Sequence, residues 1–219
     1  FIDFNAMIYN AYNLFDKDSN IKLKPYEIEN IIIDEVIKYT KYLITEIVKP
    51  TKLVYISIDG SAPLSKMVQQ RARRYKSVIE EDYQNYLQKK YNLKDNKNKF
   101  DKCSISPGSN FMYKLSEKLK LTIKDKSIHE GIEIEKIVLS DSSVPGEGEH
   151  KFLPYLKKLP NIERHAIFSP DADMIILSIL CNKDNIYILK QYSDFQKMVK
   201  FNEENPPDFI YLDITFCKE

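Results

Sequence analysis

The sequence predicts an α/β protein in which a mainly parallel central sheet lies between two layers of helices. Short runs rich in β-branched and aromatic residues alternate with longer segments that repeat apolar residues at helical spacing. Several of the short runs end in an acidic residue just before a helical segment begins. This alternation favours parallel strands joined by crossover helices, so we expect a three-layer α/β/α arrangement.

The first ninety residues are predicted to contain two strands and three helices. "FIDF" at 1–4 and "KLVYISID" at 52–59 have the composition of strands. We expect helices over 5–15, 25–48 and 62–91, the second of which has a proline at its first position. Strand and helix therefore alternate from the start of the chain.

The rest of the chain continues this alternation. We predict strand–helix pairs at 135–141 with 147–158 and at 165–171 with 172–180, and further strands at 185–190 and 208–216. Two polar stretches, 90–102 and 191–208, are predicted to be mobile loops. Residues 1–219 are expected to form a single domain that is truncated at both ends, because the chain opens on Phe1 inside a strand-like run.

Composition excludes several classes of protein. No run of about 18 apolar residues is present and the first residues lack the features of a signal peptide, so we expect a soluble protein without a membrane partner. The three cysteines are widely spaced and suit neither a disulfide framework nor a zinc site, which favours an intracellular protein. Without a clear basic localisation run, the cytoplasm is favoured over the nucleus. The net charge of +1 does not by itself indicate nucleic-acid binding.

Acidic residues gather where the predicted strands end. The carboxyl ends of parallel strands meet at one edge of a sheet, so acidic side chains from separate strands converge on one crevice. We expect six carboxylates there: Asp3, Asp59, Glu147, Glu149, Asp171 and Asp173. Each of them alone is equally consistent with a surface charge or a helix cap. Together they indicate a site.

The stretch "SSVPGEGEHK" at 142–151 places two of these carboxylates one residue apart, beside two glycines. On a regular helix Glu147 and Glu149 would point in nearly opposite directions, so they can cooperate only where the backbone is still turning. The glycines and the preceding proline allow such a turn, and glycine also lets backbone approach a bound group closely.

Carboxylates crowded into one crevice repel one another unless cations lie between them. Ligand sets made of oxygen suit Mg²⁺ or Mn²⁺, and two such ions can activate a water and stabilise the leaving oxygen in phosphodiester hydrolysis. We therefore predict a catalytic site with two metal ions. Asp141 also ends a strand, but we expect it to cap a turn, and we expect His150 to make local contacts instead of binding a phosphate.

Three of the four arginines fall within four positions of one predicted helix. Lys66, Gln70, Arg73 and Arg74 lie at i, i+4, i+7 and i+8, which is a single helical face. A solvated basic surface is one interpretation. Arginine is scarce elsewhere, however, and its guanidinium donates paired hydrogen bonds to phosphate oxygens. We therefore predict a pocket for a terminal phosphate, which favours a 5′-monophosphate over a bridging diester.

Four motifs, in this order, resemble the N-terminal conserved region of the Xrn family of 5′→3′ exoribonucleases: "DGSAPLSKMVQQRARRYK" (59–76), "SISPGSNFM" (104–112), "VPGEGEHK" (144–151) and "SPDADMIIL" (169–177). The resemblance implies a fold related to PIN domains and flap endonucleases, and metal-dependent hydrolysis of RNA with a free 5′-monophosphate. It places the metal ligands at the six acidic positions above and the phosphate pocket on the basic face. Tyr9 stands where the family usually has a base-stacking histidine, and tyrosine can also stack on a base.

The chain also departs from the family. It has no tryptophan to complete the stacking, and it lacks the family's opening Met-Gly-Val-Pro segment and the later Gly-Asn-Asp motif that carries a further metal-binding aspartate. We expect a fragment that holds most of a 5′→3′ exoribonuclease site, which acts on single-stranded RNA with a 5′-monophosphate and releases mononucleotides. The alternatives are a structure-selective DNA 5′ exonuclease or flap endonuclease, and a non-catalytic RNA-binding module.

Overall fold

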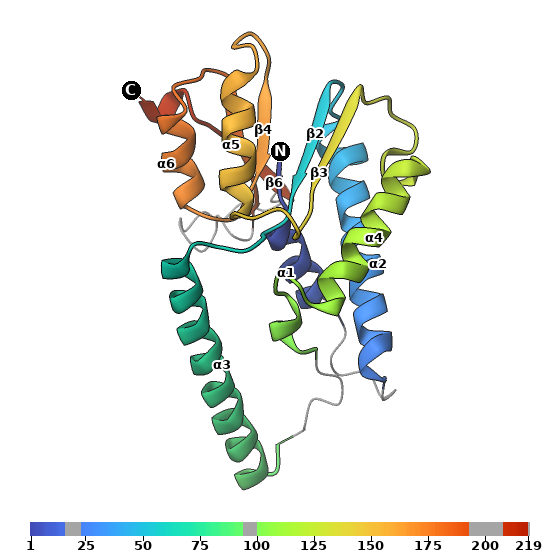
Figure 1. The fold of residues 1–219 in the computed structure, drawn as a ribbon, viewed down its shortest axis with the longest axis vertical. Helices are drawn as coiled ribbons and strands as arrows, with labels where there is room; N and C mark the ends of the chain where they lie inside the picture. The colour runs from blue at the N-terminus through green and yellow to red at the C-terminus, as the bar shows by residue number, and fades with distance from the viewer. Residues whose placement is uncertain (16–22, 94–99, 193–207, 219) are drawn as a thin grey trace.

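A six-stranded sheet organises the protein. The computed structural model describes residues 1–15, 23–93, 100–192 and 208–218, with the strands in the order β3-β2-β1-β4-β5-β6 (Figure 1). The strands are β1 (Ile2–Asp3), β2 (Leu53–Ser57), β3 (Lys136–Ser140), β4 (His165–Phe168), β5 (Ile186–Gln191) and β6 (Phe209–Asp213). The first five pair in parallel and β6 pairs antiparallel to β5, so the mainly parallel sheet is confirmed.

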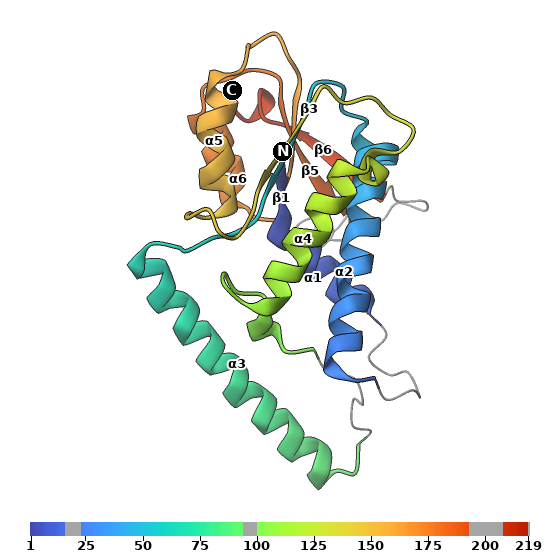
Figure 2. The same ribbon diagram turned by 45° about the vertical axis from the view of Figure 1, so that its right-hand side comes forward.

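Helices cover both faces of this sheet, which confirms the three-layer prediction. The long helices are α1 (Phe4–Leu14), α2 (Pro25–Tyr42), α3 (Leu64–Lys90), α4 (Asn110–Lys124), α5 (Gly148–Lys158) and α6 (Asp173–Leu180). One core cluster joins the sheet to α1, α2 and α4, and includes Phe4, Ile32 and Phe111. A second joins it to α5 and α6, and includes Phe152 and Met174. Figures 1 and 2 show the two groups of helices on opposite sides of the strands.

The helix α2 illustrates how local chemistry defines these elements. Pro25 occupies its first position and the Glu27 carboxylate accepts a hydrogen bond of 2.6 Å from the backbone nitrogen of Lys24. Apolar residues recur on the face that packs against the core. The last six residues of the predicted helix, Leu43–Val48, form a π-helix that ends at Lys49 in the left-handed conformation. The predicted extent of 25–48 is therefore confirmed, with a wider final turn.

The helix α4 was not predicted from the sequence. Ser109 caps it, because its Oγ accepts a hydrogen bond of 3.2 Å from the backbone nitrogen of Met112. The apolar residues Phe111, Leu115 and Leu119 recur at helical spacing and are buried. Both signals are present in the sequence, although the motif at 104–112 includes only the first three residues of α4.

Parts of the two predicted mobile loops, residues 94–99 and 193–207, lie outside the described residues. Within 90–102, Lys90 ends α3 and Phe100 is buried in the core. Within 191–208, Gln191 belongs to β5. The mobility of both segments stays a prediction. None of the helices that the structure describes is long and apolar enough to cross a membrane.

The helix α3 stands apart from the layers. None of its 27 residues, all of which the structure describes, is buried, and Figures 1 and 2 show it projecting away from the sheet. It begins after a tightly packed turn. The backbone nitrogen of Gly60 donates to the oxygen of Gly146 at 2.9 Å, and the nitrogen of Gly146 donates to the oxygen of Ser61 at 2.9 Å. These bonds fix the base of α3 to the turn that precedes α5.

Gly60 provides a test of this fixed base. A Cβ atom at this position would lie 1.9 Å from the backbone oxygen of Val144, so the two turns would have to separate. We expect Gly60→Ala to lower the free energy of unfolding by about 3 kcal/mol, as measured by urea denaturation. Gly131→Ala is the control, because its Cβ meets nothing within 4 Å and only its φ of +84° is unfavourable; it should cost about 1 kcal/mol. Equal losses of stability in the two variants would contradict the close approach of Gly60 to Val144.

Candidate active site

Three carboxylates from different parts of the chain meet at the carboxyl edge of the sheet. Asp3 ends β1, Asp59 lies two residues beyond β2, and Glu149 is in the first turn of α5. One oxygen from each lies within 4.8 Å of the others. Asp3 and Asp59 therefore converge from strand ends, and Glu149 joins them from the turn that enters the helix, as expected from the sequence.

A second group of possible ligands shares Glu149 with the first. Glu147, Glu149 and His150 each place one ligand atom within 4.8 Å of the other two. The carboxylate oxygens of the two groups suit a divalent cation such as Mg²⁺ or Mn²⁺. Glu149 thus lies between two adjoining positions where an ion could be held.

The last two predicted ligands are placed differently. Asp171 is exposed, lines the same cavity as the first group, and adds its charge to the repulsion that Asp3 experiences. Asp173 is the exposed first residue of α6 and is not among the described residues that line this cavity. The structure therefore brings together five of the six predicted carboxylates, and the place of Asp173 in the metal site stays a prediction.

The glycines beside the carboxylates have two separate roles. Gly146 has a φ of +109°, which lets the chain turn before α5. Gly148 is buried, and its backbone nitrogen donates a hydrogen bond of 2.7 Å to Asp59. A Cβ at Gly148 would lie 3.2 Å from a carboxylate oxygen of Asp3. Glycine at this position therefore allows α5 to begin directly against two of the carboxylates.

Polar side chains that the sequence analysis missed hold the carboxylates in place. The Asn5 amide donates to Asp59 at 2.7 Å and accepts from the Asp59 backbone nitrogen at 3.3 Å. The buried Ser169 hydroxyl donates to Asp3 at 3.0 Å. Both residues sit within two positions of a predicted ligand, in "DFN" and "SPD", and this proximity is the only sequence signal that could have indicated them.

Burial and like charges make this site unfavourable for negative charge. Burial, together with the charges of Asp59 and Glu149, raises the pKa of Asp3 to about 7. Burial is also the main cause of the raised pKa values of Asp59 and Glu149. Lys66 offsets part of this charge, because its Nζ lies 2.9 Å from a carboxylate oxygen of Glu147. That hydrogen bond in turn raises the pKa of Lys66.

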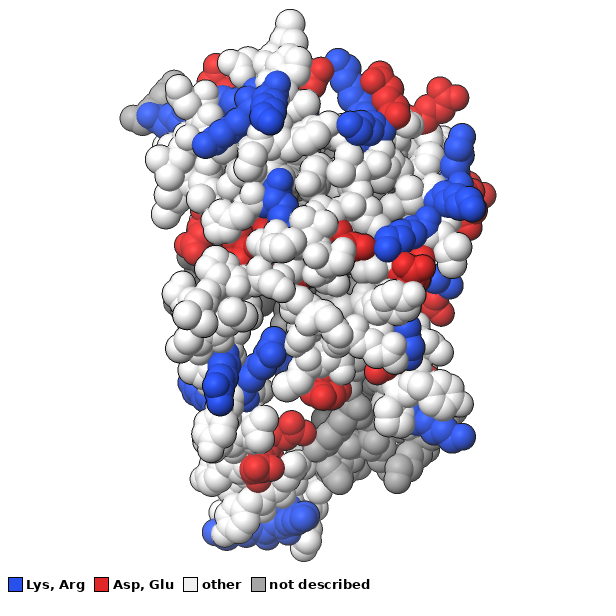
Figure 3. All heavy atoms as spheres, in the orientation of Figure 1, with Lys and Arg blue, Asp and Glu red and all other residues white. Residues whose placement is uncertain are grey.

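The predicted basic face lies across a cavity from these acids. The cavity has a volume of about 930 Å³, and α3 lines one side of it with Lys66, Gln70, Arg73 and Arg74. Tyr9, on α1, lines the same cavity and is 44% exposed, which leaves its ring accessible for stacking. Figure 3 shows acidic side chains near the level where α3 joins the sheet layers, and basic side chains farther along α3 beside a hollow.

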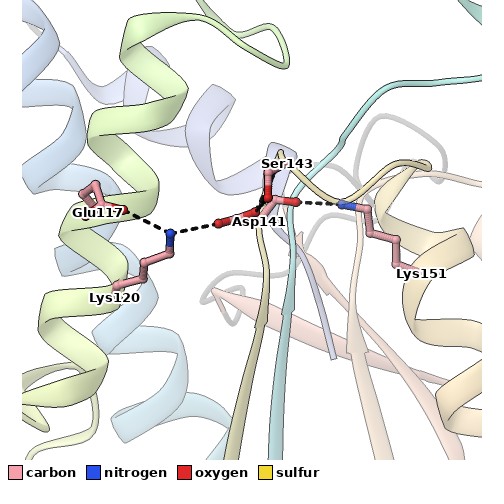
Figure 4. A network of polar contacts seen from close by, with 5 residues as sticks. All are labelled: Glu117, Lys120, Asp141, Ser143 and Lys151. Carbon is pink, nitrogen blue, oxygen red and sulfur yellow. Dashed lines mark hydrogen bonds and ion pairs between the residues drawn. The ribbon is translucent and has the colours of Figure 1, made fainter.

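Asp141 is a turn residue, as predicted. Its carboxylate accepts hydrogen bonds from the backbone nitrogen and hydroxyl of Ser143 and pairs with Lys120 at 3.1 Å (Figure 4). Its backbone oxygen accepts a bond of 2.9 Å from Lys151, which also donates to the oxygen of Ile58 at 2.6 Å. Lys151 thereby joins the ends of β2 and β3 to α5.

Comparisons with known proteins give matches that cover most of the chain. The family model "XRN 5'-3' exonuclease N-terminus" matches residues 1–192. The chain is 33% identical over 205 residues to "5'-3' exoribonuclease 1" of Saccharomyces cerevisiae, covering 89% of this chain and 13% of that protein. It is 37% identical over 169 residues to "5'-3' exoribonuclease 2 homolog" of Caenorhabditis elegans, covering 68% of this chain and 17% of that protein. The chain therefore spans less than a fifth of the length of either relative.

The raised pKa of Asp3 predicts how stability depends on pH. Its folded-state pKa of about 7 exceeds the ordinary value of 3.8, so the stability that protonated Asp3 contributes is complete below pH 3.8 and lost as the pH rises through 7. We expect metal-free Asp3→Asn protein to gain stability relative to the unsubstituted protein between pH 4 and pH 8. The relative gain is at most about 4 kcal/mol, measured by urea denaturation in the presence of a chelator.

Asp141→Asn is the control for this titration. Burial opposes the charge of Asp141, but hydrogen bonds from Ser143 and Lys120 outweigh it and lower the pKa of Asp141. The stability that Asp141 contributes is therefore present above pH 3.8 and lost in acid, so its substitution should change the pH dependence in the opposite direction. A difference between Asp3→Asn and the unsubstituted protein that does not vary with pH would contradict the environment assigned to Asp3.

Proposed function

The chain belongs to the XRN 5'-3' exonuclease N-terminus family, and we propose that it supplies the catalytic carboxylates and the end-binding residues of a 5′→3′ exoribonuclease. The substrate proposed is single-stranded RNA with a 5′-monophosphate, and the products are mononucleotides. The observation that carries the proposal is one cavity lined on one side by converging carboxylates and on another by the basic face of α3. The names of the two relatives above point to the same activity.

The carboxylates fit a site for divalent metal ions. They are crowded enough to raise their own pKa values, and they present oxygen ligands in two adjoining groups. Asp3, Asp59 and Glu149 would hold one ion, and Glu147 with Glu149 a second, with Mg²⁺ or Mn²⁺ as the ions proposed. When bound, two such ions supply an activated water and stabilise the leaving oxygen of a phosphodiester.

The protein's own side chains position the RNA end. Gln70, Arg73 and Arg74 donate hydrogen bonds to the terminal phosphate, whose charge and oxygens match an amide and two guanidinium groups. Lys66 lies next to the carboxylates, because its ammonium forms an ion pair with Glu147. The same ammonium can therefore contact either a carboxylate or the terminal phosphate. Tyr9 stacks on a terminal base. The terminal phosphate and the scissile phosphate are then bound by different parts of one cavity.

The proposal is tested with the full-length protein that carries these residues, in Mg²⁺, on matched RNAs with 5′-monophosphate, 5′-hydroxyl or 5′-triphosphate ends and on the same sequence as DNA. We expect stepwise loss of the monophosphate RNA from its 5′ end. Glu149→Gln should reduce this rate by more than the roughly 10- to 100-fold that loss of an outer ligand partner costs. Asp141→Asn, outside the carboxylate groups, should leave the rate nearly unchanged.

Other outcomes of this experiment favour different functions. Equal degradation of the DNA of the same sequence would favour a DNA 5′ exonuclease, and RNA binding without any cleavage would favour a non-catalytic RNA-binding module. An unchanged rate in Glu149→Gln would remove that residue from the metal site.

The basic face is tested by its contribution to end selection. Arg74→Ala should weaken binding of the 5′-monophosphate RNA by about tenfold to a hundredfold, the range expected for one charge-assisted hydrogen bond, and bring its affinity closer to that of 5′-hydroxyl RNA. Arg71→Ala is the matched control, because Arg71 lies on the same helix but is not among the described residues that line the cavity. An equal effect of the two substitutions would indicate a general electrostatic attraction and no phosphate pocket.

A further inference from the structure

A lysine is buried in the sheet at the edge that carries the carboxylates. Lys190, on β5, is 5% exposed and directly follows Leu189, which lies opposite the last residue of β4, Phe168. Side chains alternate between the two faces of a strand, so Lys190 shares a face with Ile186 and Ile188, which pack in the second core cluster. An ammonium therefore occupies a position where the pattern of β5 would place another apolar side chain.

The partners of this ammonium are backbone oxygens of the loop that follows β4. Burying an ammonium costs free energy unless its protons are hydrogen-bonded. The Lys190 Nζ donates to the oxygen of Pro170 at 2.8 Å and to the oxygen of Asp171 at 3.3 Å. Pro170 and Asp171 both line the cavity of the candidate active site. Lys190 therefore holds the loop that carries one of the predicted metal ligands.

Ser169 holds the same loop at a second point. Its buried hydroxyl donates to the Asp3 carboxylate at 3.0 Å and accepts a hydrogen bond of 3.3 Å from the backbone nitrogen of Asp171. The backbone of Asp171 is thus bonded at its nitrogen and at its carbonyl oxygen, whereas its side chain is exposed. The position of the residue is fixed, and its carboxylate can still turn toward a cation.

Fixing this backbone matters because the carboxylates repel one another. Burial is the main cause of the raised pKa of Asp3, and the charge of Asp171 adds to it. An exposed loop can relieve such repulsion by moving away from the sheet, which would also take its carboxylate away from a bound cation. Hydrogen bonds from Lys190 oppose this movement, because β5 is held in the sheet between β4 and β6. The two bonds tie the loop to the strand whatever the net charge around the ammonium is.

A second buried lysine shows what distinguishes Lys190. Lys183 is 4% exposed and likewise donates to a backbone oxygen, that of Leu159, and to the Asn161 side chain at 2.8 Å. These partners lie between α5 and β4, at the opposite edge of the sheet. The two lysines are therefore alike in burial and in the kind of bonds they make, and they differ in the loop that they hold.

In the function proposed above, on which this inference rests, cations lie among the carboxylates and Asp171 is one of the predicted ligands. We propose that Lys190 is a positioning residue for this site: it holds the backbone of Asp171 against the repulsion of the other carboxylates, so that the Asp171 carboxylate can join the ligands of an ion beside Asp3. Lys190 contacts neither the ion nor the RNA and acts only through the loop.

The test measures Mn²⁺ binding to the full-length protein without RNA, by isothermal titration calorimetry. Lys190→Met keeps an unbranched side chain and removes the donors. We expect its affinity for Mn²⁺ to fall about tenfold, the lower end of the range for loss of a group that orients a metal ligand. In the Asp171→Ala background, which lacks the ligand to be positioned, Lys190→Met should change the affinity less than twofold.

Lys183→Met is the matched control. It removes an equally buried ammonium from the opposite edge of the sheet, so it should lower stability in urea denaturation and change the affinity for Mn²⁺ less than twofold. An equal loss of affinity in Lys183→Met and Lys190→Met, or no loss in Lys190→Met, overturns the positioning role. If Lys190→Met does not fold, Asp171→Ala alone still decides, because an unchanged affinity would leave Lys190 no ligand to position.

Failure of the proposed function would give different results. An unsubstituted protein that binds Mn²⁺ but does not degrade 5′-monophosphate RNA overturns the proposed catalysis alone, because the affinity for Mn²⁺ still decides the role of Lys190. An unsubstituted protein that does not bind Mn²⁺ overturns both.

Discussion

Mutual repulsion among carboxylates at the carboxyl edge of the sheet is the constraint on which the rest of the site depends. A parallel sheet brings these strand ends together whatever residues they carry, so Asp3 is buried beside Asp59 and Glu149. The surrounding structure compensates with donors. Backbone nitrogen from Gly148, the Asn5 amide and the Ser169 hydroxyl each bond to a carboxylate. These neutral donors reduce the repulsion without removing it, which leaves the site prepared for cations.

Much of this arrangement could be predicted from the sequence because it depends on periodicity and on strand ends. The alternation of strands and helices predicted the three layers of the fold. The acidic residues at or near strand ends predicted a group of carboxylates at one edge of the sheet. The spacing of Lys66, Gln70, Arg73 and Arg74 gave a basic face that does line the cavity. Each of these inferences uses a repeat or a position that the backbone geometry makes regular.

What the sequence could not provide were contacts between segments far apart in the chain. The bonds of Asn5 to Asp59 and of Ser169 to Asp3 join residues separated by 54 and 166 positions. The ion pair between Lys66 and Glu147 is of the same kind, and it shows that one member of the basic face also borders the carboxylates. The close approach of Gly60 to Val144 is likewise invisible in either turn alone. The omission of α4 was different, since its cap and its apolar spacing were present in the sequence.

Because α3 is exposed along its length and fixed at its base, its side chains are not all held in position equally well. A small rotation about the fixed base near Gly60 displaces each residue in proportion to its distance along the helix. Lys66 lies about 3 Å from the start of α3 and Arg74 about 15 Å, whereas Gln88 lies about 36 Å from it, so the same rotation moves Gln88 more than twice as far as Arg74. Directional hydrogen bonds tolerate little displacement. The helix thus carries the residues proposed to bind the terminal phosphate in the half nearer its fixed base, where a rotation displaces them least.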